Sequence, residues 1–323
     1  MSAPGCRALY FTAPGKIEIR EEPLPSPKEG ELVLHSCLQG ISPGTERLMF
    51  TGDFPQGMQS DPAMDGFSGS FDYPFRYGYI NVAADDTGRR FFAFRDHVTR
   101  FTARPEELIP LPDSMNNETA LLIPHTETAL SIVHDLNPRL GDRILVSGAG
   151  IVGTLTAELL ERYQGCTVTV VDPLPDKARF FDKKRIAFFT STGDVPEFGN
   201  FDAAVDASAA PAGLQSCIDG VGFEGRVLAA SWFGDREVGL NLGRNFHRKR
   251  LKLISSQVSR IGSSLGSLWN KERRMHLTLQ IAESMQRRDL VTHRFPLSRA
   301  IDAFTLIDTP DESFGLIALD PEE

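Results

Sequence analysis

Short runs of alternating apolar and polar residues fill the first third of the chain. They lie at 6–11, 16–21 and 31–38, with two more at 90–94 and 99–102, and turns rich in proline and glycine separate them. Alternation with a period of two puts apolar side chains on one face of a strand, so each run predicts a short β-strand. This part of the chain is therefore expected to be β-rich.

The spacing of apolar residues becomes helical near Asn117 and then changes to an alternation of strands and helices. From Arg143 onward, runs that are apolar throughout alternate with the helical segments 152–163 and 175–184. The runs expected to form strands are 144–146, 167–172, 201–207, 225–231 and 250–255. Strands that are apolar on both faces and alternate with helices indicate a doubly wound parallel sheet, so the expected fold class is α/β.

The rest of the chain adds two helices, two strands and one long loop. The final part predicts helices at 272–288 and 297–307 and strands at 292–296 and 315–319. The loop at 51–72 is polar and rich in glycine and methionine. A loop of this length is typical of a lid or a substrate-binding loop.

A glycine-rich turn follows the first apolar strand of the alternating part. It comprises Gly148, Ala149, Gly150, Ile151, Val152 and Gly153. The GxGxxG pattern alone is a weak signal, but here it joins an apolar strand to a helix, and Asp172 ends the next strand 19 residues beyond the last glycine. Gly148 permits a tight turn, Gly150 lets the backbone approach a pyrophosphate, and Gly153 allows close packing of helix on strand. The unit predicts a dinucleotide site with the pyrophosphate at the helix N-terminus.

The acidic residue after the second strand sets the expected cofactor. A carboxylate at Asp172 can accept the ribose hydroxyls of NAD, whereas the extra phosphate of NADP would bring like charges together. NAD(H) is therefore expected in preference to NADP(H). Lys177, at the start of the following helix, either lies along the adenosine or is solvated.

The composition is that of an ordinary globular protein and narrows the range of partners. The 323 residues carry a formal net charge of −9, and 41% of them are hydrophobic. This balance provides no basic field to attract nucleic acid or an anionic membrane. The N-terminus lacks a signal-peptide pattern and no run of about 18 apolar residues occurs, so a cytoplasmic protein with no membrane partner is expected. The four cysteines form no CxxC pair, which indicates buried thiols and no disulfide framework.

The order of these segments resembles the medium-chain dehydrogenase/reductase superfamily along essentially the whole chain. The resemblance rests on ELVLHSCLQGISPGTE, GDRILVSGAGIVG, VVDPLPDKARF and HRFPLSRAIDAF. Within the superfamily, GISPGTER, FAFRDHVTRF, HRKRLKLISSQVS and THRFP are similar to the branch that includes bacteriochlorophyllide a dehydrogenase. The resemblance implies a GroES-like β-rich catalytic domain, formed by 1–121 and 267–323, and a Rossmann NAD-binding domain at 122–266.

The resemblance also implies where a catalytic zinc would be held. Zinc members of the superfamily use a cysteine, a histidine, and a second cysteine or an acid. At the matching places this chain has Ser42, Tyr79 and about Pro124. None of these supplies the thiolate, imidazole or carboxylate that Zn²⁺ prefers, so no metal site is expected.

Without a metal ion, side chains must handle the proton that accompanies hydride transfer. The resemblance brings Glu46, Tyr79, His97 and His125 near the nicotinamide. His97 either relays a proton or lines the pocket and makes a structural hydrogen bond. Tyr79 either donates to a substrate oxygen or fills the space of the missing metal. Glu46 stands where relatives use an acid to hold an arginine, so a salt bridge is expected there.

The segment around His125 leaves further alternatives open. His125 either relays a proton or is a buried histidine bonded to Glu127. The resemblance implies that Thr128 contacts the nicotinamide; otherwise its hydroxyl bonds its own helix. Arg47, Arg76 and Arg95 either select an acidic substrate or are solvated surface residues.

These observations together predict a zinc-independent, NAD(H)-dependent oxidoreductase that interconverts an alcohol and a ketone or aldehyde on a small molecule. Two alternatives remain: a quinone or enoyl reductase, which Asp172 disfavours because such enzymes usually use NADPH, and a non-catalytic nucleotide-binding accessory protein. Relatives commonly dimerise through the edge strands of their nucleotide sheets, so the segment 252–258 implies a homodimer. The basic run 247–252 is expected to be a solvated turn before that strand.

Overall fold

A computed structural model describes residues 5–55, 57, 71–163, 165–182, 184–309 and 313–321. The chain forms two compact units, one made of Met1–Pro124 with Ala282–Glu323 and the other of His125–Ile281. The domain boundaries expected from the sequence stay a prediction. The later of them lies before helix α6 (Lys271–Met285), whereas the unit boundary lies within this helix. Most of the loop 51–72, expected as a lid, lies outside the described residues.

The first unit is built on a seven-stranded sheet of order β14-β15-β3-β4-β5-β7, with β6 paired to β3. Its strands are β3 (Leu32–Ile41), β4 (Asn81–Asp85), β5 (Arg90–Ala93), β6 (Arg100–Ala103), β7 (Leu108–Pro110), β14 (Val291–Pro296) and β15 (Leu316–Asp320). A separate antiparallel pair consists of β1 (Gly5–Ala13) and β2 (Lys16–Pro23). All five strands expected in the first third of the chain are confirmed.

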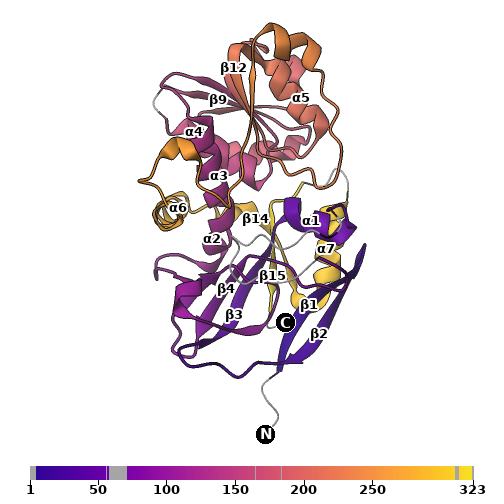
Figure 1. The fold of residues 1–323 in the computed structure, drawn as a ribbon, viewed down its shortest axis with the longest axis vertical. Helices are drawn as coiled ribbons and strands as arrows, with labels where there is room; N and C mark the ends of the chain where they lie inside the picture. The colour runs from indigo at the N-terminus through magenta and orange to yellow at the C-terminus, as the bar shows by residue number, and fades with distance from the viewer. Residues whose placement is uncertain are drawn as a thin grey trace. The chain divides into compact units, whose positions relative to one another are not determined.

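The end of the chain completes this unit. Strand β15 pairs antiparallel with β3 and parallel with β14, so C-terminal residues extend the N-terminal sheet. Helices α1 (Pro43–Thr51) and α7 (Ala300–Asp308) lie near the β1–β2 pair (Figure 1). Phe11 and Phe304 are fully buried between these elements, with ring centroids 5.2 Å apart. Burial of such aromatic side chains is the main source of stability for the small core they share.

The second unit is a six-stranded parallel sheet of order β10-β9-β8-β11-β12-β13. Its strands are β8 (Arg143–Ser147), β9 (Thr167–Val171), β10 (Ile186–Phe189), β11 (Phe201–Asp206), β12 (Val221–Ala229) and β13 (Lys252–Ser255). In chain order this is the 3-2-1-4-5-6 arrangement of a dinucleotide-binding sheet. Figure 1 shows α4 (Ile151–Glu161) on one side of the sheet and α5 (Pro211–Gly220) on the other. The expected α/β class, with a GroES-like unit and a Rossmann unit, is confirmed.

Some local expectations were wrong. The helical pattern from Asn117 forms two helices, α2 (Asn117–Leu121) and α3 (Ile123–Leu136). Pro124 lies in the first turn of α3, where the lack of an N–H costs little, so a new helix can begin there. The helix expected at 175–184 is a 3-10 helix over Pro175–Phe181.

The remaining long helix is α6 (Lys271–Met285). The other short helical segments are Pro105–Glu107, Thr192–Asp194, Leu242–Phe246, Ser263–Leu265, Arg288–Leu290 and Leu297–Arg299.

No helix in the described part of the chain has the length and apolar character needed to cross a membrane.

Candidate functional site

The glycine turn between β8 and α4 is packed so tightly that two of its glycines have no room for a side chain. Gly148 has φ +100°, and a Cβ there would lie 2.7 Å from the carbonyl oxygen of Ala207. A Cβ on Gly153 would lie 2.0 Å from the carbonyl oxygen of Gly148. The turn, the first turn of α4 and the segment after β11 therefore pack backbone against backbone. These are the roles that the sequence assigns to the first and third glycines.

Gly150 is different, because its missing side chain leaves open space. It is the N-cap of α4 with φ −70°, and a Cβ built on it has no neighbouring atom within 4 Å. Ile151 and Val152 follow as the first residues of the helix, whose N-terminal N–H groups and partial positive charge suit an anion. The cradle at Gly150 therefore fits a pyrophosphate approaching the backbone.

Asp172 lies directly after β9 and its carboxylate is held beside the glycine turn. Its Oδ2 accepts a hydrogen bond from the Ala149 N–H (2.7 Å), and its Oδ1 accepts one from the Leu174 N–H (3.0 Å). The residue is half-buried, and each oxygen keeps a lone pair for a second donor. The carboxylate is thus fixed and still able to accept ribose hydroxyls.

Lys177 is not the solvated side chain that one expectation allowed. It is buried in the 3-10 helix, with its Nζ 5.6 Å from the centre of the Phe180 ring. Burial lowers the pKa of the Lys177 ammonium, while the nearby Asp172 raises it. Lys177 therefore contributes a partly compensated positive charge close to the acidic residue.

In the first unit, two candidate residues expected from the sequence form one buried pair. His97 Nε2 lies 2.7 Å from Glu46 Oε2, and both side chains are fully buried. The other ring nitrogen, Nδ1, lies 3.1 Å from Gln39 Oε1, and the Gln39 amide donates to the Val98 carbonyl (2.9 Å). The Ser42 N–H donates to Glu46 Oε1 (2.8 Å). The described partner of Glu46 is therefore a histidine and not the arginine expected from the sequence.

The hydrogen bonds of His97 and Glu46 limit the pair to two protonation forms. Gln39 uses its NH₂ group on Val98, so its oxygen faces His97 and the Nδ1 atom must donate. The Nε2 atom faces a carboxylate oxygen, so a proton must lie between His97 and Glu46. The pair is either an imidazolium with a carboxylate or a neutral imidazole with a carboxylic acid. In both forms it holds one proton away from water.

Tyr79 lies beside this pair. Gly78 has φ +132°, and a Cβ there would come within 3.0 Å of the His97 ring, so the backbone before Tyr79 rests directly on the imidazole. The phenol of Tyr79 hydrogen-bonds the side chains of Ser42 and Thr45, and burial raises its pKa to about 12. The group therefore stays protonated over the whole physiological range.

The residues at the zinc positions of relatives do not fit a zinc ion. Ser42 and Tyr79 are engaged with each other through their hydroxyl groups, and neither supplies a ligand that Zn²⁺ prefers. Within the described ranges, no group of three or more histidine, cysteine, aspartate or glutamate side chains is placed to hold a metal ion. We derive no chemical step through a metal.

The remaining candidates lie in α3, within the second unit. His125 is buried, and burial lowers its pKa to about 4, so the imidazole is neutral near pH 7. Glu127, expected as its partner, instead pairs with Arg274 at 2.9 Å. Thr128 follows on the same helix. The catalytic role of His125 and the cofactor contact of Thr128 stay predictions.

The arginines expected near the substrate are all paired with acids. Arg47 binds Asp308 (2.9 Å), and Arg95 lies 3.2 Å from Asp96. Arg76 binds Glu22 (3.0 Å) and Asp96. Their charges are compensated inside the first unit, so the expected selection of an acidic substrate gains no support.

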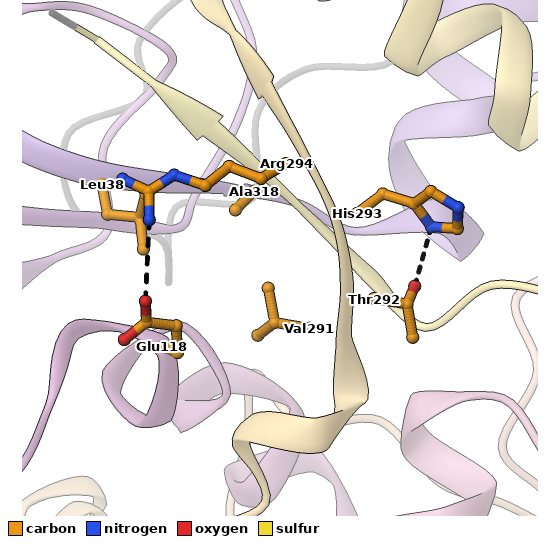
Figure 2. A pocket seen from close by; sticks show the side chains of 7 residues that line it. All are labelled: Leu38, Glu118, Val291, Thr292, His293, Arg294 and Ala318. Carbon is orange, nitrogen blue, oxygen red and sulfur yellow. Dashed lines mark hydrogen bonds and ion pairs between the residues drawn. The ribbon is translucent and has the colours of Figure 1, made fainter.

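A pocket of about 180 Å³ lies beside β14 in the first unit (Figure 2). Arg294 and Glu118 face each other across it at 3.7 Å, and Arg294 also pairs with Asp320. His293 points to the other side of the strand, where its Nδ1 lies 2.9 Å from the Thr292 hydroxyl. Two carboxylates compensate the arginine, and we assign the pocket no part in the chemistry.

Sequence reasoning missed three residues that shape these sites: Gln39, Gly78 and Arg274. Gln39 lies in an alternating strand, where a polar residue ordinarily faces solvent, but it is fully buried. Gly78 lies between two residues of the same short segment that the sequence did single out, Arg76 and Tyr79. Arg274 is one of two adjacent arginines on an exposed-looking helix. No local signal separates the buried member from the exposed one.

Curated proteins of similar sequence include dehydrogenases. The chain is 25% identical over 221 residues to the zinc-type alcohol dehydrogenase-like protein YphC of Escherichia coli, covering 65% of this chain and 60% of YphC. It is 23% identical over 180 residues to D-guloside 3-dehydrogenase of Escherichia coli, covering 52% of this chain and 50% of that protein. The chain thus spans between half and three fifths of these relatives. No family model matches it.

Solved structures show the same fold over nearly the whole chain. The alcohol dehydrogenase RspB from Escherichia coli, crystallised with NADH, aligns with a TM-score of 0.74 at 15% identity and covers 98% of this chain and 99% of its own. The quinone oxidoreductase of Thermus thermophilus, also solved with NADPH, aligns with a TM-score of 0.72 at 20% identity and covers 98% of this chain and 100% of its own. These likenesses show that the chain shares the fold of these two oxidoreductases.

Proposed function

We propose that this chain is an NAD(H)-dependent oxidoreductase that interconverts a hydroxyl and a carbonyl group on a small molecule without zinc. The observation that carries the proposal is the open cradle at Gly150, next to a fixed Asp172 carboxylate, in a sheet of dinucleotide-binding order. The similarity to D-guloside 3-dehydrogenase favours a sugar hydroxyl as the substrate group.

The residues of the second unit would hold the cofactor. The N–H groups at the start of α4 would bind the pyrophosphate, with Gly150 leaving room for it. Asp172 would accept hydrogen bonds from the adenosine ribose, and its negative charge would disfavour the 2′-phosphate of NADP. The bound nicotinamide supplies or accepts the hydride. The preference for NAD over NADP is part of the proposal.

The first unit would handle the proton. Tyr79 stays neutral because burial raises its pKa to about 12, so its O–H can donate to a carbonyl oxygen as that oxygen gains negative charge. The phenolate left behind would regain a proton from solvent water, relayed through the hydroxyls of Ser42 and Thr45 that bond it. The buried His97 and Glu46 would hold the Gly78 backbone, and with it the tyrosine, in place. His97 is thus proposed as a positioning residue.

Several further properties of the protein are predicted from its sequence. These are zinc independence, placement in the branch of bacteriochlorophyllide a dehydrogenase, a homodimer formed through β13, and a cytoplasmic location. Strand β13 is one of the two edge strands of its sheet, and its Leu253 is 38% exposed. An edge strand presents unpaired backbone groups that a second copy can bind.

A substrate screen tests the proposed activity. Purified protein is offered alcohols and polyols with NAD, and ketones, aldehydes, quinones and enones with NADH or NADPH, while the nicotinamide absorbance is followed. The metal content of the same sample is measured. Steady turnover of a hydroxyl or carbonyl compound without stoichiometric zinc supports the proposal. Turnover of quinones or enones with NADPH alone would favour the reductase alternative, and no turnover would favour an accessory protein.

A further inference from the structure

Arg274 on α6 makes an unusually complete set of hydrogen bonds for a side chain that is only 3% exposed. Its Nε donates to Glu127 Oε1 (3.0 Å), and its Nη1 donates to the Ser131 hydroxyl (3.2 Å). Two further bonds go to backbone carbonyls: Nη1 to Arg260 (3.3 Å) and Nη2 to Val258 (2.6 Å). One guanidinium therefore joins helix α3 to the segment 256–260.

The same segment is fastened to α3 at other points. The Ser256 hydroxyl donates to Asp135 Oδ2 (2.6 Å). Further along, the Trp269 ring packs on His134 with centroids 4.5 Å apart. The connection from β13 to α6 is long, and connections of this length without strands of their own are commonly functional. Here side chains of α3 and α6 hold it in one conformation.

The topology gives this segment a place relative to the cofactor. Ligands of a doubly wound sheet bind outside the carboxyl ends of its strands. The glycine turn on β8 and Asp172 on β9 mark the pyrophosphate and adenosine side, so β11, β12 and β13 belong to the nicotinamide side. The segment 256–260 directly follows the carboxyl end of β13. Its backbone would therefore flank the nicotinamide half of a dinucleotide bound at this edge.

We propose that Arg274 is a positioning residue for the nicotinamide, because it fixes the backbone of 256–260 against α3 at the carboxyl end of the sheet. The inference rests on the proposed binding of NAD(H). An arginine suits this place because its planar fork donates in several fixed directions at once, to a carboxylate and to two carbonyls. A lysine can keep the charge next to Glu127 but cannot satisfy both carbonyls.

The test compares two ligands that share everything except the nicotinamide. NADH and ADP-ribose are titrated into wild-type protein and into Arg274→Lys, with thermal unfolding measured in parallel. We expect the variant to bind NADH about tenfold more weakly, because carbonyls of the segment lose their donors, while its affinity for ADP-ribose stays unchanged. The matched control is Arg143→Lys at the amino end of β8, whose side chain pairs with Glu197 (3.1 Å) and Asp202 (3.2 Å); it should bind both ligands as wild type does.

A second variant covers the case in which Arg274→Lys does not fold. Glu127→Gln keeps an oxygen that accepts from Arg274 but removes the charge, so it should weaken NADH binding in the same direction and by less. Unchanged NADH affinity in the variants, or equal losses for NADH and ADP-ribose, would overturn the inference. If wild-type protein bound neither ligand, the proposed function would fall, and the inference with it.

Discussion

The glycine turn allows a test in which three similar substitutions should have different consequences. Gly150→Ala adds a methyl group with no protein atom within 4 Å, at a φ of −70° that alanine adopts readily. Gly153→Ala puts the same methyl group 2.0 Å from the carbonyl oxygen of Gly148. Gly148→Ala puts a Cβ 2.7 Å from the carbonyl oxygen of Ala207, and it places a side chain on a backbone with φ +100°. Only the first change leaves the protein's own packing intact.

The structure sets the size of each effect. For Gly150→Ala, the loss of a good N-cap residue costs up to about 1 kcal/mol, and the stiffer unfolded chain returns about 0.4–1 kcal/mol. The net change in the free energy of unfolding is therefore close to zero. Gly153→Ala must push backbone apart, which costs about 1–3 kcal/mol or more. Gly148→Ala adds the strain of a positive φ to its own overlap, about 1–2 kcal/mol further.

Two assays separate stability from binding. Urea unfolding followed by circular dichroism gives the free energy of unfolding, and NADH fluorescence gives the dissociation constant. Gly150→Ala should unfold like wild type and bind NADH at least about tenfold more weakly, a loss of about 1.4 kcal/mol, because its methyl group takes the space of the pyrophosphate. Wild-type affinity in Gly150→Ala would refute the assigned place of the cofactor. Unchanged stability in Gly153→Ala would refute the described packing.

Four further changes test separate parts of the structure. Asp172→Ser should weaken NADH and strengthen NADPH, so the ratio of their dissociation constants shifts about tenfold or more toward NADPH. Glu46→Gln should cost about 3 kcal/mol of unfolding free energy, because it breaks a fully buried pair with His97. Between pH 6.5 and about 4, His125 binds a proton in the unfolded state but not in the folded state. The free energy of unfolding should therefore fall by roughly 3 kcal/mol as the pH drops through that window, and it should fall by less in His125→Asn. Leu253→Lys should convert a dimer to a monomer in light scattering.

Each of these has a contrary result. Equal affinity for NADH in wild type and Asp172→Ser would show that the Asp172 carboxylate does not contact the cofactor. A loss below about 1 kcal/mol in Glu46→Gln would mean that the buried pair contributes little. Identical pH dependence of unfolding in His125→Asn and wild type would contradict a neutral, buried imidazole. A wild-type monomer at all concentrations would rule out the proposed dimer.

The cofactor unit could be predicted because its signals are local. A glycine turn, an apolar strand before it and an acid after the next strand all lie within a short stretch of chain, and the structure places them together. The positive φ at Gly148 and the lack of space for a side chain at Gly148 and Gly153 can be inferred from the sequence, because only glycine tolerates them. Helix α5 was not expected, because its proline and glycine residues hide a short helical pattern.

The contacts between distant segments could not be predicted. Glu46 and His97 were each singled out, but they are 51 positions apart, and only the pairing of strands in the first sheet brings them together. Arg274 and Glu127 are 147 positions apart and join two helices. Such partners depend on tertiary packing, which a single sequence does not specify locally. For the same reason Glu46 was expected to bind an arginine and binds a histidine.

The most direct test of the central claim follows the hydride itself. NADH that carries deuterium at both hydrogen positions of C4 is incubated with a carbonyl substrate identified in the screen and with protein of measured zinc content, and the product is analysed by mass spectrometry. Zinc-independent hydride transfer predicts an alcohol that carries one deuterium on the former carbonyl carbon, formed by protein without stoichiometric zinc. A product without deuterium, or deuterium transfer only in protein that holds one zinc per chain, would contradict it.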